Sequence, residues 1–149
     1  MNKHKITWIE LFDTCAALAL KVVNHEGGFN DIVAIARGGL LPAHFLAYKF
    51  DIRRIHSVGI SYYNGEEKMK HPIIYQPLAA DFSFSKVLLI DEIVDSGDTF
   101  HFVKNELINR GCGDIITASL YYKPCSKFKP DYFGKEVDAK EWITFPYDE

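Results

Sequence analysis

The segment Val87–Thr99, VLLIDEIVDSGDT, constrains the fold of this chain more than any other part of its sequence. Its first four residues are continuously apolar, which is typical of a strand buried on both faces of a sheet. Two adjacent acids, Asp91 and Glu92, follow the strand. The polar run Asp95–Thr99 then begins a helix that Gly111 ends. The segment therefore predicts a strand, a polar loop and a helix.

The rest of the chain repeats this alternation. A capping box at Thr7–Glu10 begins a first helix. The predicted helices cover roughly residues 8–24, 40–50 and 98–110, and the predicted strands cover residues 31–36, 55–62, 73–75, 86–90 and 114–121. Tyr63–His71 is polar and has no apolar periodicity, and the segment from Lys123 onward is expected to be irregular with short strands. The pattern predicts one α/β domain over residues 1–149, with a mostly parallel central sheet flanked by helices.

Composition excludes several classes of function. The net charge of -3 argues against a nucleic-acid partner, because phosphate binding needs clustered Lys and Arg. No apolar run reaches the length of a membrane span, and the first residues lack the apolar core of a signal peptide. We therefore expect a cytoplasmic protein with no membrane partner. The three cysteines lack the spacing of zinc ligands.

The polar loop after Ile90 suits a phosphorylated sugar. Backbone N–H groups at a helix N-terminus bind phosphate, and Gly97 lets the backbone approach the anion. Asp91 and Glu92 can accept hydrogen bonds from a vicinal diol or help to bind a divalent cation. One alternative is a capped helix with Asp95 or Ser96 as its N-cap. Another is a Walker B strand, but the chain lacks the accompanying G-x-x-x-x-G-K-[ST] loop.

A second loop with anion-binding chemistry follows the predicted strand 31–36. Gly38 and Gly39 allow backbone amides to surround an oxyanion, and Arg37 adds positive charge. Ligands of open parallel sheets bind beyond the carboxyl ends of the strands, so both loops should lie at one edge. A sugar with phosphate at both ends would span them.

These residues carry a resemblance to a known family. VLLIDEIVDSGDT resembles the signature of the type I phosphoribosyltransferases, which bind 5-phosphoribosyl 1-diphosphate (PRPP). The chain is also similar to the xanthine-guanine members over nearly its whole length. The shared motifs, in order, are Arg37-Gly38-Gly39, Ser61-Tyr62, Asp91–Thr99, Lys123-Pro124, Trp142-Ile143 and Pro146-Tyr147-Asp148. The resemblance implies the family's fold, with a small C-terminal hood.

The resemblance also implies roles for the PRPP-binding residues. Asp91 and Glu92 would bind the ribose hydroxyls, and one of them would help to organise Mg2+. The 5-phosphate would lie against Asp95, Ser96, Gly97, Asp98 and Thr99. Asp95 would be the catalytic residue that accepts or relays the proton lost by the base. Arg37 and Gly38 would face the pyrophosphate.

Other implied roles concern the base, the metal and a lid. Lys123 would donate to a purine 6-oxo oxygen, Trp142 would stack on the base, and the Ile143 backbone would contact its 2-position. Asp148 would reach the metal or the pyrophosphate. Residues 63–71 would be a catalytic lid, and the lid residues would be Ser61, Tyr62, Lys68 and Lys70. The alternatives are a solvated Lys123, a core Trp142, a solvated Asp148 and an ordinary surface loop.

The chain departs from the family pattern at two places. Its acid pair is Asp-Glu, where many purine members have Glu-Asp or Asp-Asp. Asp98 stands where several members have Gly. A carboxylate inside a phosphate site weakens binding unless its side chain points outward.

The sequence thus predicts a purine salvage enzyme. A 6-oxopurine (guanine, xanthine or hypoxanthine) would attack C1 of PRPP through N9 and displace pyrophosphate, with Mg2+ neutralising the leaving group. We expect a homo-oligomer, either a dimer or a tetramer. One alternative is a non-catalytic, PRPP- or nucleotide-sensing regulator on the same fold. A pyrimidine or adenine acceptor is another, although a lysine donor suits a 6-oxo group better than a 6-amino group.

Overall fold

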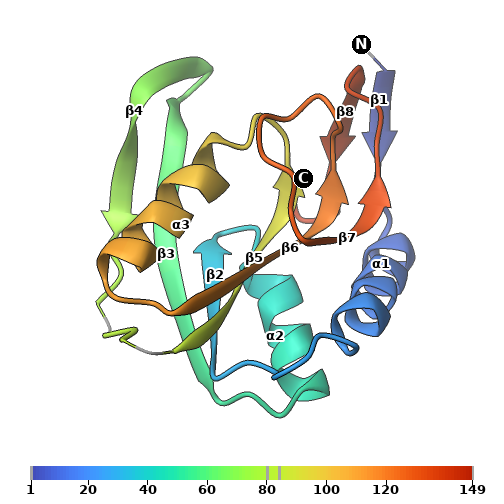
Figure 1. The fold of residues 1–149 in the computed structure, drawn as a ribbon. Helices are drawn as coiled ribbons and strands as arrows, with labels where there is room; N and C mark the ends of the chain where they lie inside the picture. The colour runs from blue at the N-terminus through green and yellow to red at the C-terminus, as the bar shows by residue number, and fades with distance from the viewer. Residues whose placement is uncertain (1, 80, 84, 149) are drawn as a thin grey trace.

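A six-stranded sheet forms the centre of the protein (Figure 1). The computed structural model describes residues 2–79, 81–83 and 85–148. The strand order is β4-β3-β2-β5-β6-β7, and all neighbours are parallel except β3 and β4. The strands are β2 Asp31–Ala36, β3 Arg54–Asn64, β4 Glu67–Gln76, β5 Lys86–Val94, β6 Asp114–Tyr122 and β7 Tyr132–Glu136. The predicted α/β architecture with a mostly parallel sheet is confirmed.

Helices cover both faces of this sheet. The helices are α1 Trp8–Val22, α2 Leu40–Lys49 and α3 Asp98–Asn109. Ile32 and Leu88 pack with residues of α1 and α2 on one face, whereas Val33 and Leu89 pack with residues of α3 on the other. The central strands β2 and β5 are therefore buried on both sides, which explains their continuous apolar runs. In the described part of the chain, no helix is both long and apolar enough to span a bilayer.

A second, two-stranded sheet joins the two ends of the chain. It consists of β1, Asn2–Lys5, and β8, Glu141–Thr144, which are parallel and lie side by side in Figure 1. The sequence pattern predicts the short strands after Lys123 but not β1. This small sheet corresponds to the predicted C-terminal hood. The N-terminal strand β1 also contributes to it.

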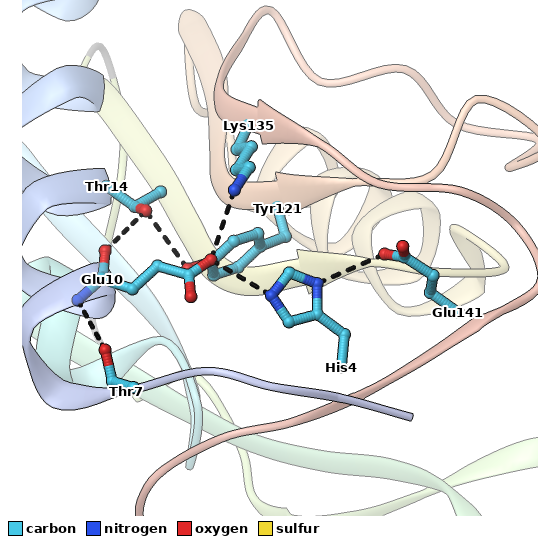
Figure 2. A network of polar contacts seen from close by, with 7 residues as sticks. All are labelled: His4, Thr7, Glu10, Thr14, Tyr121, Lys135 and Glu141. Atoms are coloured by element: carbon cyan, nitrogen blue, oxygen red, sulfur yellow. Dashed lines mark hydrogen bonds and ion pairs between the residues drawn. The ribbon is translucent and has the colours of Figure 1, made fainter. Parts of the chain in front are cut away.

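Polar contacts attach the small sheet to α1 and β7 (Figure 2). His4 lies between two carboxylates, with Nε2 3.4 Å from Glu10 Oε1 and Nδ1 3.4 Å from Glu141 Oε2. Lys135 of β7 reaches the same Glu10 oxygen at 3.3 Å. Thr7 caps α1 as predicted, because its Oγ1 accepts from the Glu10 N–H at 3.1 Å. The carboxylate of Glu10 thus binds the neighbouring strands.

Three strands extend further than their sequence pattern indicated. Strands β3 and β4 form a hairpin through the polar segment 63–71, and the turn contains Gly65 at φ 64°. Because β4 is an edge strand, its ladder needs no apolar alternation. Strand β5 continues to Val94, so Asp91 and Glu92 belong to the end of a strand rather than to a loop.

Asp31, at the start of β2, is a fully buried acid. Its carboxylate accepts hydrogen bonds from Arg54 Nε at 2.9 Å, from His56 Nε2 at 2.8 Å and from Ser85 Oγ. Burial raises the pKa of Asp31, but the bonds from Ser85 and His56 and the charge of Arg54 outweigh it, and the pKa is lowered. The folded state therefore favours the ionised acid.

This shift predicts a stability that depends on pH. A carboxyl whose pKa is lower in the folded state stabilises the fold above its unfolded pKa of about 4, and this contribution is lost as the pH falls further. We expect D31N to lower the free energy of unfolding by about 2 kcal/mol at pH 7, and by progressively less below pH 4. Urea unfolding from pH 7 to pH 3 measures this. D51N is the control, because the Asp51 side chain is 88% exposed; an equal effect of the two variants would contradict the prediction.

Candidate functional site

The two predicted anion-binding loops lie at the same edge of the sheet. Strands β2 and β5 are parallel neighbours, with Ala34 paired to Ile90, so their carboxyl ends point the same way. The loops also touch: a Cβ atom on Gly38 would overlap the carboxyl group of Glu92. The structure therefore brings the Arg37–Gly39 loop against the acid pair, as the sequence predicted.

Glycine is required where the first loop enters α2. A Cβ atom on Gly39 would lie 2.5 Å from the Ile90 carbonyl oxygen and 2.7 Å from that of Ile35. Gly39 is the N-cap of α2, and the peptide bond between Ala36 and Arg37 is cis. The loop backbone thus lies directly on the ends of the two central strands.

The acid pair is poorly compensated by positive charge. Burial and the neighbouring charge of Glu92 raise the pKa of Asp91 well above its usual value. The pKa of Glu92 is also raised, mainly by burial and further by Asp148, although Tyr147 and Arg37 oppose the rise. A cation or a set of hydroxyl donors would relieve this excess of negative charge.

These two carboxylates suit Mg2+ as a donor set. Mg2+ prefers oxygen ligands and is usually held by one or two carboxylates together with substrate phosphates. No group of three or more His, Cys, Asp or Glu side chains in the described residues could hold a metal ion by itself. Asp148 therefore does not complete a protein-only metal site with Asp91 and Glu92.

The loop between β5 and α3, residues 95–97, ends at a left-handed glycine; we call it the phosphate loop after the role predicted for it. Gly97, at φ 90°, is the N-cap of α3 and provides no side-chain cap. The alternative that Asp95 or Ser96 is the N-cap is therefore wrong. A Cβ atom on Gly97 would lie 2.5 Å from Phe128 Cβ, so the loop packs tightly against the chain that follows β6. The start of α3 is thus held in place beside the acid pair.

Two predicted site residues from distant parts of the sequence contact each other at this edge. Asp95 follows β5, and Lys123 follows the neighbouring strand β6. The Asp95 side chain is 62% exposed, whereas that of Lys123 is 7% exposed, and Nζ lies 3.4 Å from Oδ1. The Lys123 N–H also donates to the Val94 carbonyl at 3.0 Å. The alternative of a solvated Lys123 is wrong: its stem is buried and its ammonium group faces the predicted catalytic acid.

The other predicted base-binding residues lie on β8. Trp142 is 57% exposed, so the alternative of a core aromatic is wrong for this residue. Ile143 is partly buried against the core. Within the described residues, no hydrogen bond or ring contact joins Trp142 to another predicted site residue. The structure leaves its indole ring available at the surface of the small sheet.

The C-terminal segment contacts the acid pair through a residue that the sequence analysis did not select. The Tyr147 hydroxyl donates to Glu92 Oε2, and its ring stacks on Phe145 at 5.5 Å. Asp148 itself accepts from the Phe145 N–H at 2.7 Å and so closes a turn. The motif containing Tyr147 was visible in the sequence, but only the fold shows which of its side chains reaches Glu92.

Of the four predicted lid residues, Lys68 has the most direct contact with the start of α3. Lys68 Nζ on β4 lies 2.8 Å from Asp98 Oδ2 at the start of α3. Ser61 and Tyr62 lie on β3, and the negative charge of Asp98 contributes to the raised pKa of Tyr62, after burial. Lys70 is exposed on β4 and forms no ion pair among the described residues.

Comparisons with known proteins agree on one family. A family model described as "Phosphoribosyl transferase domain" matches residues 7–149. A xanthine-guanine phosphoribosyltransferase from Gluconobacter oxydans (strain 621H) is 37% identical over 144 residues, which are 96% of this chain and 83% of the relative.

Two solved structures are also similar over nearly their whole length. A purine phosphoribosyltransferase from Pyrococcus horikoshii superimposes with a TM-score of 0.86 and 32% identity, covering 100% of this chain and 95% of that one. A xanthine-guanine-hypoxanthine phosphoribosyltransferase from Helicobacter pylori gives 0.79 and 27%, covering 99% and 94%.

Proposed function

This chain belongs to the phosphoribosyl transferase family, and we propose that it transfers the 5-phosphoribosyl group of PRPP to a 6-oxopurine. The products are a nucleoside monophosphate and pyrophosphate. The observation that carries this proposal is the pairing of Lys123 with Asp95 beside the phosphate loop, at 3.4 Å. The names of the relatives, which include xanthine, guanine and hypoxanthine, support the same class of base.

Different residues at the sheet edge bind different parts of PRPP. The start of α3, from Asp95 to Thr99, binds the 5-phosphate through backbone N–H groups and hydroxyls. Asp91 and Glu92 accept hydrogen bonds from the ribose hydroxyls. Arg37 and the backbone at Gly38 stabilise the pyrophosphate as it leaves.

Mg2+ belongs to the proposal as the cofactor. Asp91 and Glu92 are the residues that would hold it, and it would supply positive charge to the departing pyrophosphate. Asp148, whose charge raises the pKa of Glu92, would approach the metal or the pyrophosphate beside them.

The base lies between Lys123 and the small sheet in this proposal. Lys123 donates a hydrogen bond to the 6-oxo oxygen, and Asp95 accepts the proton that the five-membered ring loses. Adenine presents an amino group at position 6 and cannot accept from an ammonium group there. Trp142 stacks on the base, and the Ile143 backbone contacts its 2-position.

The lid, the assembly and the location complete the proposal. The β3–β4 hairpin, with Ser61, Tyr62, Lys68 and Lys70, closes over the reacting atoms and excludes water. The protein acts as a single domain in a cytoplasmic homo-oligomer, a dimer or a tetramer, and light scattering of the purified protein measures its mass.

Pyrophosphate release tests the reaction. Purified protein with PRPP, Mg2+ and guanine, xanthine or hypoxanthine should release pyrophosphate, and addition of EDTA should stop the release. Adenine and uracil should give little turnover. No turnover with any 6-oxopurine would contradict the proposal, and PRPP binding without turnover would favour the sensing regulator.

A further inference from the structure

Asp98 places a negative charge where a phosphate is proposed to bind. It is the first residue of α3, whose N-terminal N–H groups form the phosphate site. Its carboxylate accepts from Ser96 Oγ at 3.1 Å, so it stays close to the loop although its side chain is 31% exposed. An uncompensated carboxylate at this position would repel a phosphate dianion.

The positive charge that compensates Asp98 comes from the hairpin. Lys68 Nζ lies 2.8 Å from Asp98 Oδ2, a distance typical of a charge-assisted hydrogen bond. The hydrogen bond that Lys68 donates to Asp98 raises the pKa of Lys68 and lowers the pKa of Asp98. Both residues therefore remain charged near neutral pH.

Other charged and titratable groups face this ion pair. Lys127, in the chain after β6, acts on Asp98, while Asp95 and Tyr63 act on Lys68. Lys68 is the only one of the described cations that forms an ion pair with Asp98. The balance of charge at the start of α3 therefore depends on a residue of β4.

We propose that Lys68 is a positioning residue that neutralises Asp98 and thereby lets the start of α3 bind the 5-phosphate. This inference rests on the proposed function. Lys68 acts through Asp98 and not by binding the phosphate itself. The same ion pair couples the position of the hairpin to the occupancy of the phosphate site, because phosphate binds well only when the hairpin supplies the cation.

A double-mutant cycle tests the coupling. The dissociation constants of ribose 5-phosphate and of PRPP are measured by calorimetry for the wild type, K68Q, D98N and K68Q/D98N. We expect K68Q to weaken binding about tenfold when Asp98 is present, because the carboxylate is then unpaired. In the D98N background the same change should cost less than about twofold. K68M repeats the test with a second neutral side chain.

The matched control is K70Q, which removes another lysine from the same strand. We expect K70Q to change binding by the same factor with and without D98N, since Lys70 does not pair with Asp98. If K68Q weakens binding equally in both backgrounds, Lys68 binds the ligand directly and this inference is wrong. If the wild type binds neither ligand, the proposed function itself fails.

Discussion

Replacement of Asp95 with Asn should lower kcat by about 100-fold or more, and weaken PRPP binding far less. Asn keeps the size and one oxygen of the side chain but cannot accept a proton at this point of the reaction. Its oxygen can still accept from Lys123, which lies 3.4 Å from the carboxylate in the present structure. The proposed phosphate site at the start of α3 should therefore persist.

Single-turnover rates and PRPP dissociation constants separate these two effects. Turnover should fall while the dissociation constant stays within about threefold of its original value. D13N is the control for the loss of one acid, because Asp13 is exposed on α1 and is not one of the predicted site residues. Equal losses of turnover and of PRPP binding in D95N would show that Asp95 only binds the ligand.

Replacement of Gly39 with Ala should lower the free energy of unfolding by about 3 kcal/mol. The added methyl group would meet three backbone atoms, the carbonyl oxygens of Ile90 and Ile35 and the amide nitrogen of Ile35, at 2.5 to 2.9 Å. Backbone atoms in the middle of a sheet cannot rotate away as a flexible side chain can. Either α2 must shift or the β2–β5 pairing must loosen.

Urea unfolding followed by circular dichroism measures this loss. G65A is a suitable comparison, because an added Cβ there meets nothing within 4 Å and only its φ of 64° is unfavourable. It should cost about 1 kcal/mol. A stability of G39A within 1 kcal/mol of the wild type would mean that the loop can move off the strand ends at little cost.

The elements that could be predicted from the sequence are those whose burial or capping requires a recognisable run of residue types. The run Val87–Ile90 is apolar because β5 is buried on both faces, and Thr7 marks the start of α1 because a helix needs a cap. Strand β1, with the sequence Asn2–Lys5, is polar and short, and only its pairing with β8 makes it a strand. The hairpin around Gly65 is likewise polar, since β4 lies at an edge.

The candidate site was predictable for a related reason. Parallel strands deliver their loops to one edge, so the proximity of Arg37 to the acid pair followed from the strand assignments. The ion pair between Lys68 and Asp98 and the bond from Tyr147 to Glu92 depend on how separate segments pack. No spacing in the sequence indicates such contacts, and the burial of Lys123 has the same origin.

The proposed site has a phosphate half, between β5 and α3, and a base half on the small sheet. Because β1 pairs with β8, the base half needs both ends of the chain. The backbone of the proposed phosphate half lies in a single continuous segment, from β5 to α3. The small sheet joins residues such as His4 and Glu141, which are 137 positions apart. Closing so long a loop is entropically unfavourable until the intervening core has formed and brought its ends together. The backbone of the proposed phosphate site is thus specified locally, with Lys68 of β4 as its distant contribution, whereas the surface that carries Trp142 depends on the entire fold.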